Sequence, residues 1–150
     1  MIQRIQSLYL LLAGIIQIIF ATGTYFTYKL QDDLYSVTGS GTFNSAGDKT
    51  SGDMKTLILG IGIAILALMS IFLFKNRKQQ MKLSRIGGLL TIAEIVFIVI
   101  SYFNTKDIAE GGFKFGYVIF ILPASTLLFF LAAKSIKKDD ELIKSVDRIR

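Results

Sequence analysis

Glu94 is the one ionisable residue within the long apolar segments of this sequence, and it lies near the middle of the apolar run from 86 to 103. A charged side chain at the centre of a bilayer costs about 3 kcal/mol on insertion scales. Gln17, Ser125 and Thr126 lie at similar depth in other apolar runs, which contain no lysine or arginine. Burial without a cation favours the neutral carboxylic acid. We take Glu94, Gln17, Ser125 and Thr126 as a candidate intramembrane polar cluster.

Two functions of Glu94 remain open at this point. In the first, the protonated side chain donates a hydrogen bond to Gln17 or to a hydroxyl group of the fourth apolar run, and so sets the helix register. In the second, Glu94 exchanges a proton with a water-filled cavity and couples that exchange to transport. The first is favoured, because a single carboxylate with no other intramembrane charge makes a poor proton relay.

The composition predicts no catalytic residue, no metal site and no cofactor. The sequence contains neither cysteine nor histidine, so it lacks thiol redox chemistry, thiolate metal ligands and the usual base of a serine hydrolase. The segment from 39 to 41 reads Gly-Ser-Gly but lacks the lysine and the following helix of a phosphate-binding loop. We therefore expect that the protein is not an enzyme.

Four windows are apolar enough to cross a bilayer, which requires about 20 residues each. Because a helix bundle satisfies its own backbone groups in lipid, we predict an all-α membrane protein, a single four-helix domain over residues 1 to 150. For the first window the alternative is a signal peptide ending near 21 to 23, but the apolar run is longer than is typical of one. The predicted spans are about 5–28, 57–74, 86–103 and 117–133.

The distribution of lysine and arginine predicts the orientation. The N-terminus, the connector 75–85 and the tail 134–150 carry one, five and six of these residues, whereas the outer loops 29–56 and 104–116 carry three and two. Because positive residues mark the cytoplasmic side, both termini are expected in the cytoplasm, with the chain in a bacterial inner membrane. The basic side chains are candidate contacts for anionic lipid headgroups or a protein partner, rather than nucleic acid. These candidates are Lys75, Arg77, Lys78, Lys82, Arg85, Lys144, Arg148 and Arg150.

The tail from 134 to 150 has the pattern of a short amphipathic helix. Leu142, Val146 and Ile149 share one face, while Asp140, Lys144 and Arg148 follow one another at a spacing of four. Such a helix lies on a membrane surface or docks on a partner. In the first outer loop, residues 34–38 and 42–43 are compatible with either a small hairpin or a mobile loop, and 111–116 with a further short strand.

Three motifs resemble a known family. They are the opening Met1-Ile-Gln-Arg-Ile-Gln6, the segment Ile71-Phe-Leu-Phe-Lys-Asn-Arg-Lys78, and the closing Asp140-Glu-Leu-Ile-Lys-Ser-Val-Asp-Arg-Ile-Arg150. In order and length the chain resembles a family of small uncharacterised four-transmembrane-helix inner-membrane proteins of Bacteroidota, a domain-of-unknown-function family. The resemblance implies no established activity and carries over no catalytic residue. It implies that the closing motif serves as a contact surface.

The predicted function is that of a structural or interaction component of a membrane complex, using a basic cytoplasmic face and the tail. The partner is expected to be another protein or a second copy of the chain, together with membrane lipids. The alternative is a small proton-coupled transporter or channel subunit centred on Glu94, working as an oligomer because four helices enclose little volume.

Overall fold

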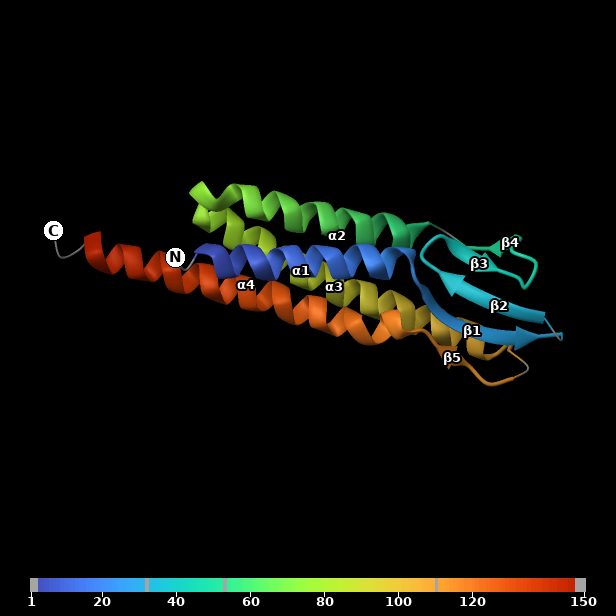
Figure 1. Cartoon of the computed structure of the whole chain (residues 1–150). Helices are drawn as coiled ribbons and strands as arrows, with labels where there is room; N and C mark the ends of the chain where they lie inside the picture. Colours follow the sequence, from blue (N-terminus) through green and yellow to red (C-terminus); the bar gives the residue numbers. More distant parts are fainter. Residues whose placement is uncertain (1–2, 32, 53, 110, 148–150) are drawn as a thin grey trace.

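The computed structural model describes residues 3–31, 33–52, 54–109 and 111–147, and its largest part is a bundle of four long helices (Figure 1). Each of these helices contains a window long and apolar enough to cross a membrane, in the part of the chain that is described. The four predicted apolar helices are therefore confirmed. They are α1 (Gln3–Thr22), α2 (Lys55–Phe72), α3 (Arg77–Lys106) and α4 (Tyr117–Asp147), with a 3₁₀ turn η1 (Leu73–Lys75) between α2 and α3.

A five-stranded antiparallel sheet lies at one end of the bundle, so the predicted all-α class was wrong (Figure 1). Its strands are short, and the order across the sheet is β4-β3-β2-β1-β5. Apart from β5, they come from the first predicted outer loop and from the end of the first predicted span. They are β1 (Thr24–Leu30), β2 (Asp33–Thr38), β3 (Gly41–Phe43), β4 (Lys49–Ser51) and β5 (Lys114–Phe115).

The first helix ends at Thr22, and the predicted span to residue 28 was too long. The backbone N–H of Gly23 donates to the Phe20 carbonyl at 3.2 Å, and the chain then continues as β1. Threonine and the aromatic residues of β1 favour the extended conformation. Tyr25, Phe26 and Tyr28 are buried in one hydrophobic cluster with Phe20 of α1.

Two other predicted boundaries change because neighbouring helices are longer than expected. Residues 77–85 of the predicted connector form the first turns of α3. The predicted short tail helix is the continuation of α4, which runs without a break to Asp147. In Figure 1 this last part of α4 projects past the ends of the other three helices.

The strand pairings decide between the alternatives left open for the outer loops. β2 and β3 form a hairpin with Ser36 opposite Phe43 and Val37 opposite Thr42, so this segment is not a mobile loop. β5 pairs with β1, with Phe26 opposite Phe115, which confirms the short strand expected between 111 and 116.

Aromatic side chains attach the sheet to the bundle. The Phe113 ring centroid lies 4.9 Å from that of Tyr102 in α3 and 5.8 Å from that of Phe26 in β1. The Tyr28 and Tyr35 rings of β1 and β2 stack at 5.4 Å. Edge and offset contacts of this kind are favourable arrangements of aromatic rings. The sheet therefore forms one core with the ends of α3 and α4.

Small residues allow the helices to approach closely. Gly60, Ala64 and Ala67, which share one face of α2, are all buried. At Gly87 of α3 a Cβ atom would lie 2.5 Å from the ring of Phe129 in α4, so a larger residue there requires the ring to move. Close approach of this type is characteristic of helix packing in membranes.

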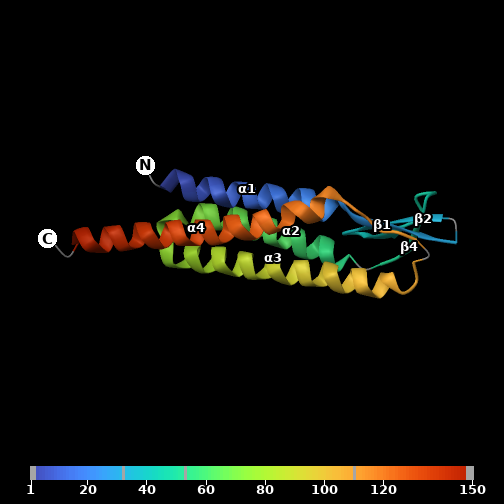
Figure 2. The same cartoon turned by 90° about the horizontal axis from the view of Figure 1, so that it is seen from below.

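The molecule has two ends that are formed by different elements. α1 begins, α4 ends and η1 lies at one end, which we call the connector end; the sheet occupies the opposite end, the sheet end (Figures 1 and 2).

Candidate functional site

Polar side chains from three helices meet in the centre of the bundle. The Gln17 side-chain amide of α1 donates to the Thr91 hydroxyl of α3 at 3.0 Å and lies 3.5 Å from the Ser125 hydroxyl of α4. Ser125 in turn donates to the Ala13 carbonyl of α1 at 3.3 Å. Gln17, Thr91 and Ser125 are fully buried. These contacts bind α1 to α3 and α4 by specific bonds in an otherwise apolar interior.

Glu94 lies beside this network, one helical turn after Thr91. Its side chain has no exposed surface, and the Gln17 side chain is close enough to interact with the carboxyl group. A Cβ atom on Gly60 of α2 would lie 3.0 Å from Glu94 Oε1, so α2 closes the site on that side. Within the described residues neither carboxyl oxygen has a hydrogen-bond partner. We call Gln17, Thr91, Glu94 and Ser125 the central polar cluster.

The structure brings together three of the four residues of the predicted cluster. Thr126 is the exception, because its hydroxyl group is buried but has no hydrogen-bond partner among the described residues. Thr91 was missed, although its position three residues before Glu94 places the two on one helical face. That spacing was the available signal.

Tyr25 of β1 was also missed, because it was placed within the first predicted span. Its ring stacks on Phe20 with centroids 4.6 Å apart, and its side chain is 2% exposed. Burial, and in second place the charge of the nearby Glu94 carboxyl group, raise the pKa of Tyr25 above its ordinary value. Its hydroxyl group has no hydrogen-bond partner in the described part of the chain.

A cavity of about 490 Å³ lies between the sheet and the adjacent ends of α2 and α3, and Tyr25 forms part of its wall. We call it the vestibule. Most of its polar lining consists of hydroxyl and amide groups, from Thr38, Thr42, Ser51, Thr56, Ser101, Asn104 and Thr105. A polar cavity at the sheet end therefore adjoins the central polar cluster through Tyr25.

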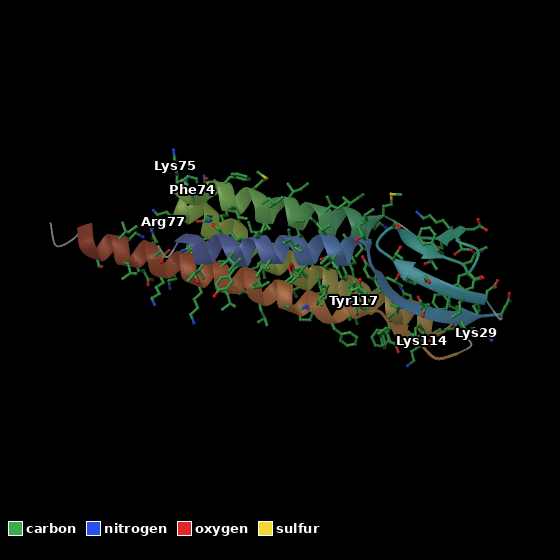
Figure 3. All side chains as sticks on the ribbon, in the orientation of Figure 1. Lys29, Phe74, Lys75, Arg77, Lys114 and Tyr117 are labelled. Atoms are coloured by element: carbon green, nitrogen blue, oxygen red, sulfur yellow. The ribbon has the colours of Figure 1, made fainter. Side chains whose placement is uncertain are left out.

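The predicted contact residues lie at or near the connector end. Lys75, Lys78, Lys82, Arg85 and Lys144 are exposed, Arg77 is half-buried, and Arg148 and Arg150 lie outside the described residues. Figure 3 shows Phe74, Lys75 and Arg77 together at this end, far from Lys29 and Lys114 at the sheet end. Arg77 also lines an open groove of about 490 Å³ whose wall includes Phe72 and Phe74.

A second set of buried polar contacts holds the connector end together. Gln6 of α1 donates to the Asp139 carboxylate of α4, and Arg77 donates to the Asp139 backbone carbonyl at 3.2 Å. Asp139 is 6% exposed, although it lies in the tail that was predicted to form a separate amphipathic helix. Its neighbour Asp140 pairs with Lys144 on the surface, as the spacing of four predicts.

A model of the protein family described as "Domain of unknown function (DUF4293)" matches residues 2–149, nearly the whole chain. The chain belongs to this family. The prediction that this DUF4293 protein belongs to a domain-of-unknown-function family is thereby confirmed. No curated protein and no solved structure matches it.

The chemistry available to the DUF4293 chain follows from its side chains. No group of three or more carboxylate, imidazole or thiol side chains that could hold a metal ion occurs among the described residues. The central polar cluster supplies one carboxyl group, one amide and two hydroxyl groups in an apolar interior. Such a set can fix helix register or hold a proton.

Proposed function

We propose that this DUF4293 protein, like the Bacteroidota proteins that it resembles, is a multi-pass protein of a bacterial inner membrane. Both of its termini and residues 75–85 lie in the cytoplasm. Large apolar side chains exposed on all four helices, such as Ile18, Ile58, Phe97 and Leu127, support contact with lipid. The excess of lysine and arginine at the connector end supports this orientation.

The proposed topology is tested by labelling single cysteines, because the chain contains none of its own. Gln79→Cys at the connector end and Thr50→Cys in β4 are both exposed positions. In intact cells a thiol reagent that cannot cross the inner membrane is expected to label Thr50→Cys alone. Labelling of Gln79→Cys alone would reverse the orientation.

Within that membrane, the protein acts by binding and not by catalysis: it presents its basic connector end and the projecting end of α4 to a partner protein. The observation that carries this proposal is that Leu142 and Ile143 are 47% and 44% exposed on the part of α4 that extends beyond the bundle (Figure 1). Apolar side chains held outside the core on a charged helix are typical of a docking face. The groove beside Arg77, with Phe72 and Phe74, suits an anionic lipid at the same end.

Affinity purification from native membranes in mild detergent tests the binding function. A partner in fixed ratio to the protein is expected to be lost when Leu142 and Ile143 are both changed to glutamine. The matched control changes Lys137 and Glu141, an exposed ion pair on the adjacent turn, to glutamine and leaves the apolar side chains in place. Retention of the partner by the first variant, or its equal loss from both, would contradict a docking face centred on these two residues.

A proton-exchange function is a second candidate, supported by the burial of Glu94 beside both the central polar cluster and Tyr25. An intramembrane carboxyl group is a functional candidate by default. Proton-dependent flux in liposomes that Glu94→Gln abolishes would support this candidate. If Glu94→Gln leaves abundance and cellular role unchanged, Glu94 serves only to fix helix register.

A further inference from the structure

The vestibule is a polar space lined in part by Tyr25, a buried residue with a polar hydroxyl group. Its wall contains the hydroxyl and amide side chains of three strands and two helices, and Tyr25. The Tyr25 hydroxyl group is buried and unbonded within the described residues. Buried polar groups are nearly always hydrogen-bonded, to protein or to water. A cavity of about 490 Å³ with many hydroxyl groups has ample room for water that would bond to Tyr25.

Tyr25 lines the vestibule, and Ala21 of α1 lies next to both Tyr25 and Glu94. A Cβ atom at Gly39 would approach the Ala21 carbonyl and the Tyr25 hydroxyl oxygen. A Cβ atom at Gly60 would approach Ala21 Cβ and Glu94 Oε1. Gly39 leaves room on the sheet side, because a Cβ atom there would lie 2.8 Å from the Tyr25 hydroxyl oxygen. The aromatic ring is held by its stack on Phe20, so the position of the hydroxyl group is fixed.

We infer that Glu94 exchanges its proton with the sheet end of the molecule, through water in the vestibule and the hydroxyl group of Tyr25. The inference rests on the proton-exchange function. It adds the route of the proton and the end of the molecule from which the proton enters. A hydronium ion in the vestibule passes a proton to the Tyr25 oxygen and becomes water, as the phenolic proton passes to the Glu94 carboxylate. The carboxylate becomes the neutral acid, the phenol is restored, and the reverse transfer releases the proton to vestibule water. Tyr25 thus relays the proton between the vestibule and Glu94.

Few charged groups compete with this route. Lys55 of α2 lines the vestibule and contributes a positive charge there. α1 and α4 face the carboxyl group with Gln17 and Ser125, which do not titrate in water, and α2 faces it with Gly60. The protonation of Glu94 is therefore governed by its burial and by the adjacent side chain of Gln17.

The test is hydrogen–deuterium exchange of the Glu94 carboxylic acid, followed by infrared spectroscopy on the full chain in lipid nanodiscs. The carboxylic C=O band is assigned by its loss in Glu94→Gln. Tyr25→Phe keeps the ring and its stack on Phe20 but removes the hydroxyl group, and is expected to slow exchange about 100-fold. Tyr28→Phe, the same change on the same strand, is the matched control and is expected to exchange at the original rate.

A second measurement identifies the end of the molecule from which the proton reaches Glu94, without changing Tyr25. Asn104→Cys places a thiol at the exposed rim of the vestibule, and Phe74→Cys places one in the groove at the connector end. A bulky thiol reagent on Asn104→Cys is expected to slow exchange, and the same reagent on Phe74→Cys is expected to have no effect.

The two hypotheses fail in different ways. Exchange that is unaffected by Tyr25→Phe and by the block at Asn104→Cys, or that is slowed by the block at Phe74→Cys, overturns the route but leaves proton exchange at Glu94 intact. A Glu94 acid band that never exchanges in the unmodified protein overturns proton exchange itself, and the route with it.

Discussion

Gly60 of α2 lies directly against the carboxyl group of Glu94 in α3. A Cβ atom at Gly60 would lie 3.0 Å from Glu94 Oε1 and also 3.0 Å from the Ala21 Cβ atom of α1. Contacts this short are tighter than ordinary van der Waals packing, so three helices meet here with no space for a methyl group. This packing keeps the Glu94 carboxyl group enclosed.

Gly60→Ala is therefore expected to lower the free energy of unfolding by about 1–3 kcal/mol, the usual cost of overpacking. Unfolding of the purified protein in detergent measures the change. Gly62→Ala is the matched control, because no atom lies within 4 Å of a Cβ atom there and Gly62 is exposed. Alanine has the higher helix propensity, so the control should be neutral or slightly stabilising. Equal effects of the two substitutions would show that helix propensity, and not packing, determines the change in the free energy of unfolding.

Gln17→Leu removes the side-chain bonds that join α1 to Thr91 and Ser125. We expect a loss of about 1–2 kcal/mol, since each bond between membrane helices contributes modestly. The loss stays small because Thr91 still donates to the Gly87 carbonyl at 2.9 Å. Thr22→Val on the same helix is the control, because the Thr22 hydroxyl bonds only to carbonyl groups of its own helix. If both variants unfold alike, the central polar cluster does not stabilise the bundle.

Asp139→Ala should loosen the connector end, because it leaves the buried side-chain amide of Gln6 without its carboxylate acceptor. An unsatisfied buried donor costs about 1–3 kcal/mol. Asp140→Ala removes an equal charge next to it but breaks only a surface pair with Lys144, and is expected to change little. Amide exchange of α1 near Gln6 measures the difference. Faster exchange in the Asp140→Ala protein than in Asp139→Ala would contradict this account.

Phe113→Ala should release the sheet from the bundle, since the Phe113 ring contacts Tyr102, Phe26 and Tyr28. The half-buried ring is expected to contribute about 1–3 kcal/mol, less than a fully buried one. Cleavage by trypsin after Lys49, which lies in the exposed strand β4, measures sheet opening. Phe120→Ala, which removes a ring that is 71% exposed, should leave the cleavage rate unchanged. Unaltered cleavage of Phe113→Ala would mean that the strand pairing alone holds the sheet.

The number and approximate position of the four apolar helices could be predicted from the sequence, because length and hydropathy are properties of each segment alone. The burial of Glu94 and its proximity to Gln17 and Ser125 followed from the same reasoning, since residues at equal depth in neighbouring helices can meet. Thr91 lay within reach of this reasoning through its spacing from Glu94.

The sheet and the place of Tyr25 were decided by the tertiary structure. An aromatic segment after an apolar helix has the same local pattern whether it lies at a membrane surface or pairs as a strand, and only the pairing of β1 with β2 and β5 distinguishes the two. Asp139 at the connector end is a second residue whose contact could not be predicted from the sequence. Its bond with Gln6 joins residues 133 positions apart, and no local pattern reports a contact made by the packing of α1 against α4.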